Sequence, residues 1–417
     1  MLFRSLAARA AQGLGGSIVM PVSLGAIIAT FPDARSRSRA IGVWSGVGSL
    51  ALAAGPMLGG WLVERSGWQS IFWLNVVPGV LTVCAAAAVL PGRTGARSAL
   101  RLDLAGQAGF VLGVCLMTVS LIEANRGGWA SLRTIGGLAG AALVLVWFLT
   151  RQGRSRHPLL PVSWLRQARF GLPNLAGCCS FFGLFGAIFS LTLYLQNLRG
   201  LSPVQAGLRF LPLTVSVCVM SLAAAAAATR WDPMGPMILG VVMVTGGLAG
   251  LTRLDVDTPY PQYWWALVLL GSGIAFCVTP GTLMALEHVE AGRSGTAGGV
   301  LNTCRQLGGI LGVAVMGAVM LGHFEGSLNQ ALASLRLPAT VRARLVERVT
   351  GGDLSGVRDL PSAIRVPVAV AVRESFAAGV RAAAVAGVVV NATCAVLLIT
   401  AWGAARRSAR TAAAPLP

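Results

Sequence analysis

Long apolar runs follow one another along almost the whole chain, and they constrain its fold more than any other feature. A helix that crosses a bilayer needs roughly 20 mostly apolar residues. Charged residues make up only 11% of the sequence, whereas soluble domains carry about 25%. We therefore predict an all-α integral membrane protein with about eleven transmembrane helices, at residues 6–30, 40–63, 70–90, 103–123, 134–150, 170–195, 205–228, 234–252, 262–285, 297–322 and 376–402.

The basic residues predict the orientation of these helices. All 33 are arginines, and they are scattered through the gaps between the runs. This pattern indicates membrane topology and no nucleic-acid partner. The short gaps of one set hold sixteen arginines, and those of the alternate set hold seven. Because arginine-rich loops face the cytoplasm, we expect a multi-pass protein of the cell membrane with its N-terminus outside and its C-terminus cytoplasmic.

The chain shows no metal or cofactor motif. Its eight cysteines lie in apolar runs without a CxxC pair, and its three histidines are dispersed. Buried thiols of this kind are typical of small packing residues, so we expect no metal site and no cofactor. A membrane-embedded enzyme is disfavoured, because it needs acids, histidines or a serine dyad clustered at membrane depth.

The second run contains an unusual concentration of helix-disfavouring residues. Glycines that recur at four-residue spacing allow helices to approach closely in lipid, and a proline removes a backbone hydrogen bond and bends its helix. The stretch "GPMLGGW" therefore predicts a kinked, tightly packed helix, and the residues concerned are Gly42, Gly55, Pro56, Gly59 and Gly60.

Four separated stretches, in this order, resemble the major facilitator superfamily, and in particular its fourteen-helix drug:proton antiporters of the EmrB/QacA type. They are "LAARAAQGLGGSIVMP" (Leu6–Pro21), "GPMLGGWLVERSGWQSIFWLNVVP" (Gly55–Pro78), "YLQNLRGLSPVQAGLRFLP" (Tyr194–Pro212) and "GTAGGVLNTCRQLGGILGVAVMG" (Gly295–Gly317). Arg9 and Gln12 match the family's fourth-helix motif, and the glycines and proline of the second run match its fifth-helix antiporter motif.

The resemblance implies an organisation for the whole chain. Residues 1–90 would be the three-helix remnant of the N-terminal half, and residues 91–169 would hold two linker helices and cytoplasmic loops. Residues 170–402 would form the six-helix C-terminal half with an extracytoplasmic loop at 323–375, and residues 403–417 a cytoplasmic tail. In this register three helices are missing before residue 6, one of them carrying an acidic motif, so we expect a truncated chain or a mis-called gene start.

The function that the resemblance implies is proton-coupled export of small lipophilic compounds, cations among them, by alternating access. The partners would be the substrate, protons and the lipid bilayer, and we expect a monomer. The alternative is a transport-inactive paralogue.

Ionisable groups inside a membrane span are functional candidates by default. No carboxylate falls at a predicted midplane. Arg9 and Gln12 lie one turn apart, and the resemblance places them on a proton pathway; a purely structural pairing is the alternative. Asn302, Arg305 and Gln306 form a polar stripe in the tenth run, which faces either a pore or another helix.

Four residues near the predicted outer ends of spans are weaker candidates for contact with substrate. The alternative for the aromatic and amide residues is anchoring at the membrane interface, and for the acid it is a helix cap. These residues are Glu123, Tyr194, Gln196 and Asn197.

Overall fold

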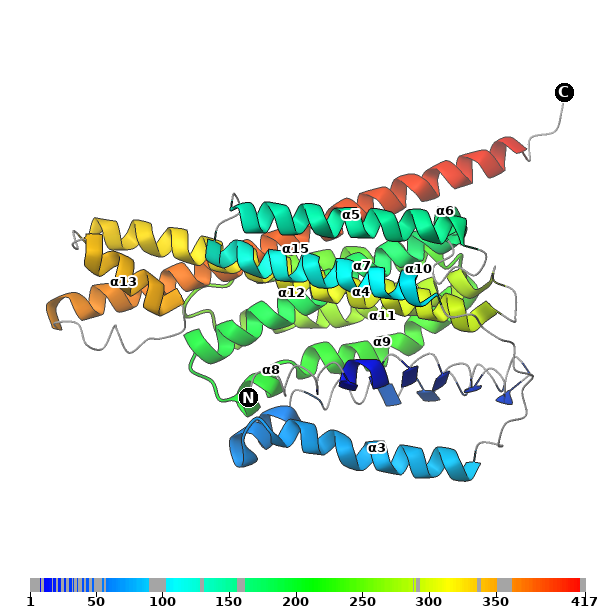
Figure 1. Cartoon of the computed structure of the whole chain (residues 1–417), viewed down its shortest axis with the longest axis horizontal. Coiled ribbons are helices and arrows are strands. Elements are labelled where there is room, and N and C mark those ends of the chain that lie inside the picture. The colour runs from blue at the N-terminus through cyan, green and yellow to red at the C-terminus, as the bar shows by residue number, and fades with distance from the viewer. Residues whose placement is uncertain are drawn as a thin grey trace.

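The computed structural model describes residues 58–89, 103–127, 131–155, 162–287, 289, 293–335, 339–350 and 362–412, together with scattered positions between residues 8 and 55. Within these residues the elements are helices (Figure 1). Nine of the described helices are long and apolar enough to cross a membrane. They coincide with the nine predicted runs from residue 70 onward, and the first two runs lie largely outside the described residues.

The long helices are α3 (Ser70–Val89), α4 (Leu104–Gly127), α5 (Leu132–Arg154), α7 (Ala168–Leu193) with its extension η1 (Tyr194–Leu198), α9 (Leu211–Arg230), α10 (Met234–Leu251), α11 (Trp264–Glu287), α12 (Ser294–Ser334) and α15 (Ser362–Ala412). The short elements are α6 (Val162–Arg166), α8 (Pro203–Arg209), η2 (Tyr260–Gln262) and α13 (Ala339–Thr350).

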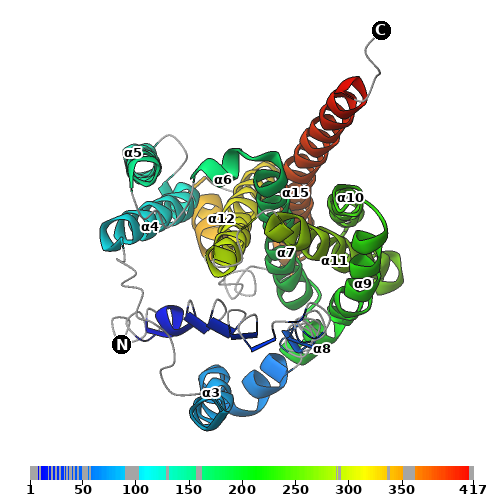
Figure 2. The ribbon, with the colours of Figure 1, turned by 90° about the vertical axis from the view of Figure 1, so that its right-hand side faces the viewer.

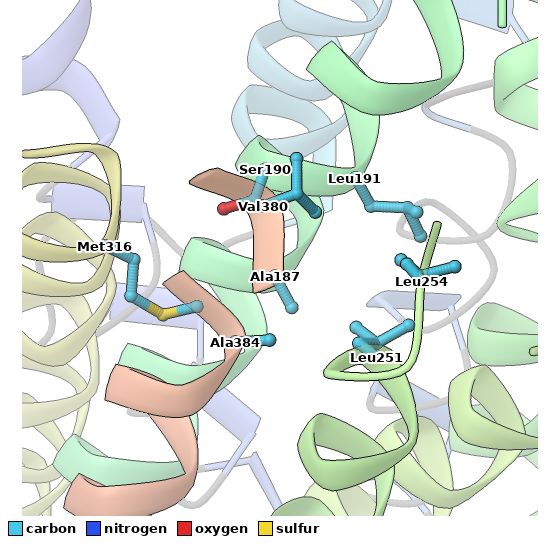
Figure 3. Close-up of a pocket in the computed structure, with 8 residues that line it drawn as sticks. All are labelled: Ala187, Ser190, Leu191, Leu251, Leu254, Met316, Val380 and Ala384. Atoms are coloured by element: carbon cyan, nitrogen blue, oxygen red, sulfur yellow. The ribbon is translucent and has the colours of Figure 1, made fainter. Parts of the chain in front are cut away.

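Six of these helices form one bundle in the second half of the chain. Helix α12 packs extensively against α7 and α15, α10 packs against α11 and α15, and α11 also contacts α9 (Figure 2). The interior is closely filled: a cavity between Ser190, Met316 and Val380 has a volume of only ≈ 10 Å³ (Figure 3). A space of this size holds no more than about one water molecule. This cavity between α7, α10, α12 and α15 therefore has no room for a drug-sized ligand.

Helices α4 and α5 form a hairpin that is fastened at one end by a single carboxylate. The two oxygens of Asp103 accept hydrogen bonds from Arg151 (3.0 Å) and from the buried Gln152 (2.8 Å). The backbone N–H of Gly106 also donates to this carboxylate, and these contacts, with that of Gly106 first, lower the pKa of Asp103. The hairpin then contacts the bundle through α4 and α12.

The segment 323–375, expected as an extracytoplasmic loop, is largely helical in its described part. Helix α12 continues to Ser334, α13 follows, and α15 already begins at Ser362. The leucines at 328 and 332, whose spacing predicts a helix, are fully buried and pack with Val346 and Val368 in a small hydrophobic core of their own. Figure 1 shows this three-helix cap projecting from one end of the bundle, which we call the α13 end.

The described end of the second run, residues 58–66, is helical and joins α3 through a tight turn. Gly67 adopts φ = 76°, a left-handed conformation that glycine reaches without steric cost and that commonly ends helices. The Ser70 hydroxyl donates to the Leu62 carbonyl at 3.0 Å and closes the turn. The helix formed by residues 58–66 therefore terminates at the α13 end of the bundle.

Candidate functional site

A half-buried arginine, whose Nε atom is fully buried, is the most conspicuous polar group inside the bundle. Arg305 lies on α12, and its Nη2 donates to the Thr282 hydroxyl (2.7 Å) and to the Val278 carbonyl (3.4 Å), both on α11. Gly177 of α7 closes the third side, since a Cβ added there would lie 3.2 Å from Arg305 Cγ. Among the described residues, no carboxylate pairs with this guanidinium, and its Nε is buried without a hydrogen-bond partner.

The polar stripe around Arg305 spans the bundle's interior and its surface. Asn302 is half-buried, and Gln306, one turn further on, is exposed. A buried polar atom without a partner is costly. Two further ones occur among the described residues, the Oδ1 atoms of Asn174 on α7 and Asn391 on α15. The stripe thus joins a guanidinium that has no carboxylate partner among the described residues to the exposed face of α12.

The glycine-rich run meets the six-helix bundle at the α13 end. A Cβ on Gly60 would lie only 2.7 Å from the backbone carbon and oxygen of Pro203, so only glycine permits this approach. One turn later, Oε1 of Glu64 accepts a hydrogen bond from Val204 N at 3.1 Å. The Ser202 hydroxyl also bonds to Glu64, and these two contacts, that of Ser202 first, lower the pKa of the Glu64 carboxyl. We call this contact the seam.

The bundle side of the seam is built for such an approach. Ser202 caps α8 in a reciprocal capping box with Gln205, and Pro203 occupies the first helical turn. A capped N-terminus presents backbone N–H groups and a partial positive charge. Both favour the carboxylate of Glu64, which therefore complements α8 electrostatically.

Some of the remaining motif residues have no close neighbours among the described residues, and others lie outside the described part of the chain. A Cβ on Gly55 or on Gly59 would meet no heavy atom within 4 Å in the described structure, unlike one on Gly60. Gln12 is exposed on a helical stretch. The candidates Arg9, Gly42 and Pro56 lie outside the described residues.

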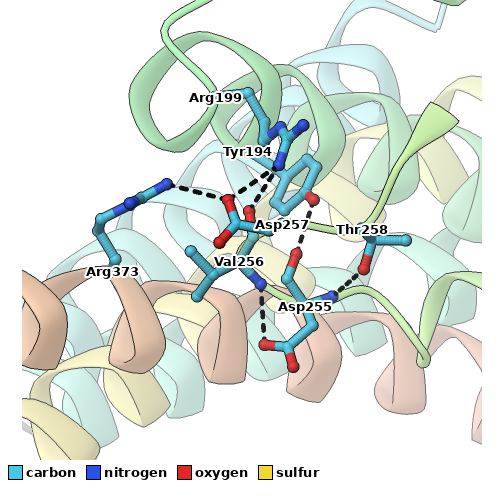
Figure 4. A network of polar contacts seen from close by, with 7 residues as sticks. All are labelled: Tyr194, Arg199, Asp255, Val256, Asp257, Thr258 and Arg373. Carbon is cyan, nitrogen blue, oxygen red and sulfur yellow. Dashed lines mark hydrogen bonds and ion pairs between the residues drawn. The ribbon is translucent and has the colours of Figure 1, made fainter.

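A polar network binds the loop between α10 and α11 to its neighbours at the α13 end (Figure 4). The Tyr194 hydroxyl donates to the Asp255 carbonyl at 2.7 Å. Arg199 and Arg373 both reach Oδ1 of Asp257, each at 3.3 Å. The network therefore connects η1, this loop and α15.

The four candidates for outer contacts have different environments. The side chain of Tyr194 is completely buried, and its hydroxyl fastens the loop between α10 and α11. Gln196 is half-buried and Asn197 is exposed on η1, and Glu123 is half-buried near the end of α4. Among the described residues, helix α4, which carries Glu123, has no extensive contact with η1, which carries the other three candidates.

Sequence reasoning found Arg305 and missed the groups around it. Thr282 carries no signal of its own, because a single threonine is common in apolar helices. Glu64 had a readable signal: it follows Gly60 by four residues, which places both on one helix face. The Ser-Pro-Val-Gln stretch at 202–205 is likewise a recognisable helix start.

The fold and these sites define a class: a multi-pass helical membrane protein with a six-helix bundle, a glycine-dependent seam and a buried charge. The sequence model of the Major Facilitator Superfamily matches residues 3–313. The chain belongs to this superfamily.

Several named relatives are identical to the chain at about a third of the aligned positions. The tetracenomycin C resistance and export protein of Streptomyces glaucescens is 32% identical over 361 residues, covering 87% of this chain and 65% of that protein. The multidrug resistance protein Stp of Mycobacterium tuberculosis is 33% identical over 422 residues, covering 98% and 76%. The methylenomycin A resistance protein of Streptomyces coelicolor is 32% identical over 336 residues, covering 79% and 69%.

Proposed function

We propose that this protein exports small lipophilic compounds, cations among them, across the cell membrane in exchange for protons. The relatives named for resistance to tetracenomycin C and methylenomycin A support antibiotics as a substrate class. Within the superfamily, the resemblance of the motif stretches favours the drug:proton antiporters. The chain acts as a transporter and not as an enzyme.

The observation that carries this proposal is the seam between residues 58–66 and α8. Alternating access rocks two halves of a transporter against each other around a central site. A contact as close as that of Gly60 with Pro203 has two discrete states, packed or separated, because packed interfaces deform little. The seam is therefore packed when the transporter is closed at the α13 end and separated when it is open there.

The polar residues then have distinct proposed roles. Arg305, with Asn302 and Gln306, lines the substrate and proton path on α12, which is consistent with a buried guanidinium that lacks a carboxylate partner among the described residues. Arg9 and Gln12 would face the same path from the other half. Gly42, Gly55, Pro56, Gly59 and Gly60 shape the moving helix.

We further propose that the α13 end is extracytoplasmic, that the tail end is cytoplasmic and that the protein works as a monomer. The counts of arginine in the short gaps support this orientation.

Ethidium efflux from cells that express the 417-residue chain tests the proposal. We expect efflux above that of an empty vector, and an uncoupler that collapses the proton gradient should abolish it. Arg305→Met should lose at least about tenfold in rate, as expected when one essential charged contact is removed, while Arg253→Gln, an exposed loop change, should not. The transport-inactive alternative predicts efflux equal to the empty vector at equal membrane expression.

A further inference from the structure

A second cavity opens at the α13 end, separate from the seam and from Arg305. Its volume is ≈ 190 Å³, and it lies between η1, α8, the loop before α11 and α15. Drug-sized pockets usually measure about 300–1,000 Å³, so this one suits a smaller chemical group. At roughly 30 Å³ per water, it has room for about six waters or one compact headgroup.

Positive charge dominates the wall of this cavity. Arg199, Arg209 and Arg373 line it, with Asp257 as the one carboxylate among its lining residues. Two of the arginines share a single oxygen of Asp257, as described above. Arg209 has no carboxylate partner among the described residues, and its guanidinium carbon lies 4.2 Å from the centre of the Tyr260 ring. The lining residues therefore carry a net charge of about +2 by the usual ionisation states.

The balance of hydrogen bonds favours an anion inside the cavity. The Asp257 side chain is 79% exposed, whereas that of Arg199 is 30% exposed, so the carboxylate lies further out than the guanidinium. Each guanidinium has five N–H donors arranged in a planar fork. These forks match the oxygens of phosphate and carboxylate groups.

The position of the cavity matches the headgroup level of a bilayer. Trp264 and Trp265 begin the adjacent span, and their side chains are 46% and 38% exposed. Exposed tryptophans at the start of a span mark the membrane interface. Leu195, Leu198 and Leu201 complete the wall and offer apolar contact beside the charged groups.

We propose that this cavity binds a phosphodiester anion, supplied either by an anionic phospholipid headgroup or by a soluble phosphodiester. The arginines hold the phosphate oxygens, and the leucines contact the adjoining glycerol or acyl carbons. Asp257 opposes the ligand, because its negative charge competes for two of the arginines. This binding site is independent of drug export, and its test requires no transport.

Native mass spectrometry of the purified full chain measures the binding. Phosphatidylglycerol is titrated against the zwitterionic phosphatidylcholine, and soluble glycerophosphoglycerol forms a separate arm. We expect selective binding of phosphatidylglycerol that Arg209→Gln weakens about tenfold or more, in line with the loss of a charge-assisted hydrogen bond. Arg253→Gln, on the loop that carries Asp257 but outside the cavity lining, is the control and should bind as the native chain does.

A variant with the opposite sign separates binding from folding. Asp257→Asn frees two guanidiniums and should strengthen binding, an effect that a destabilised protein would not show. Binding of both the lipid and the soluble phosphodiester, or of the lipid alone, supports the site and identifies its source. Equal binding by the Arg209 and Arg253 variants, or weaker binding by Asp257→Asn, would overturn the proposal.

Discussion

The substitution Gly60→Ala tests the seam directly. The new Cβ would lie 2.7 Å from two backbone atoms of Pro203, whereas ordinary contacts are about 3.5–4.0 Å. Backbone atoms do not yield as a flexible side chain does, so residues 58–66 and α8 must separate. Overpacking of this kind costs about 1–3 kcal/mol, which corresponds to a shift of roughly 5–150-fold in a two-state equilibrium.

Gly59→Ala is the matched control for this change. A Cβ there meets no heavy atom of the described residues within 4 Å, and alanine is about 1 kcal/mol better than glycine in a helix. Both variants gain the same helix propensity, so a difference between them reports the contact with α8 alone.

The assay is a distance between spin labels at the two exposed positions Arg65 and Leu208, measured by double electron–electron resonance. The eight native cysteines are first replaced, so that only the labelled sites react. Gly60→Ala should add or enlarge a long-distance population, and Gly59→Ala should leave the native distribution. Identical distributions for the two variants would refute the close approach.

Three further predictions follow from single contacts. Arg305→Met should leave the thermal stability unchanged or raise it. The variant relieves the cost of holding a guanidinium inside the bundle without a carboxylate partner among the described residues, which offsets the loss of its bonds to Thr282 and Val278; a fall of many degrees in the melting temperature would contradict this. Tyr194→Phe should lower the unfolding free energy by about 0.5–1.5 kcal/mol through loss of the bond to Asp255, measured by thermal denaturation, with efflux retained. The lowered pKa of Glu64 means that the seam is favoured above the ordinary value of 4.5 and is lost as the pH falls through the lowered value. The spin-label distance should lengthen on acidification in the native chain, and in Glu64→Gln it should not respond to pH.

The membrane spans could be predicted because their signal is local. A window of about 20 apolar residues is visible without knowledge of the neighbours, and α3 to α11 begin and end within a few residues of the predicted runs. The extensions of α12 and α15 at the α13 end were beyond this reasoning. Their helical state depends on Leu328 packing against Val368, forty residues away in sequence, and mixed polar composition conceals such a core.

The candidate site was predictable only where one residue violates its surroundings. An arginine in an apolar run is such a violation, and Arg305 was found for that reason. The hydrogen bond of Tyr194 to a distant loop was not predictable, because an aromatic residue at a span end has the same sequence pattern whether it anchors in lipid or bonds to another part of the protein. Glu64 was not predicted, because carboxylates are common at helix ends and the sequence does not reveal its partner on α8.

Coupled transport by the purified chain in liposomes tests whether the protein exchanges ethidium for protons. A pH-sensitive dye inside the vesicles reports proton movement when ethidium is added to one side. We expect proton flux that requires ethidium and that falls in both Gly60→Ala and Arg305→Met, while Gly59→Ala retains more of it than Gly60→Ala. Proton flux indistinguishable from that of protein-free liposomes, with the chain correctly inserted, would contradict this expectation.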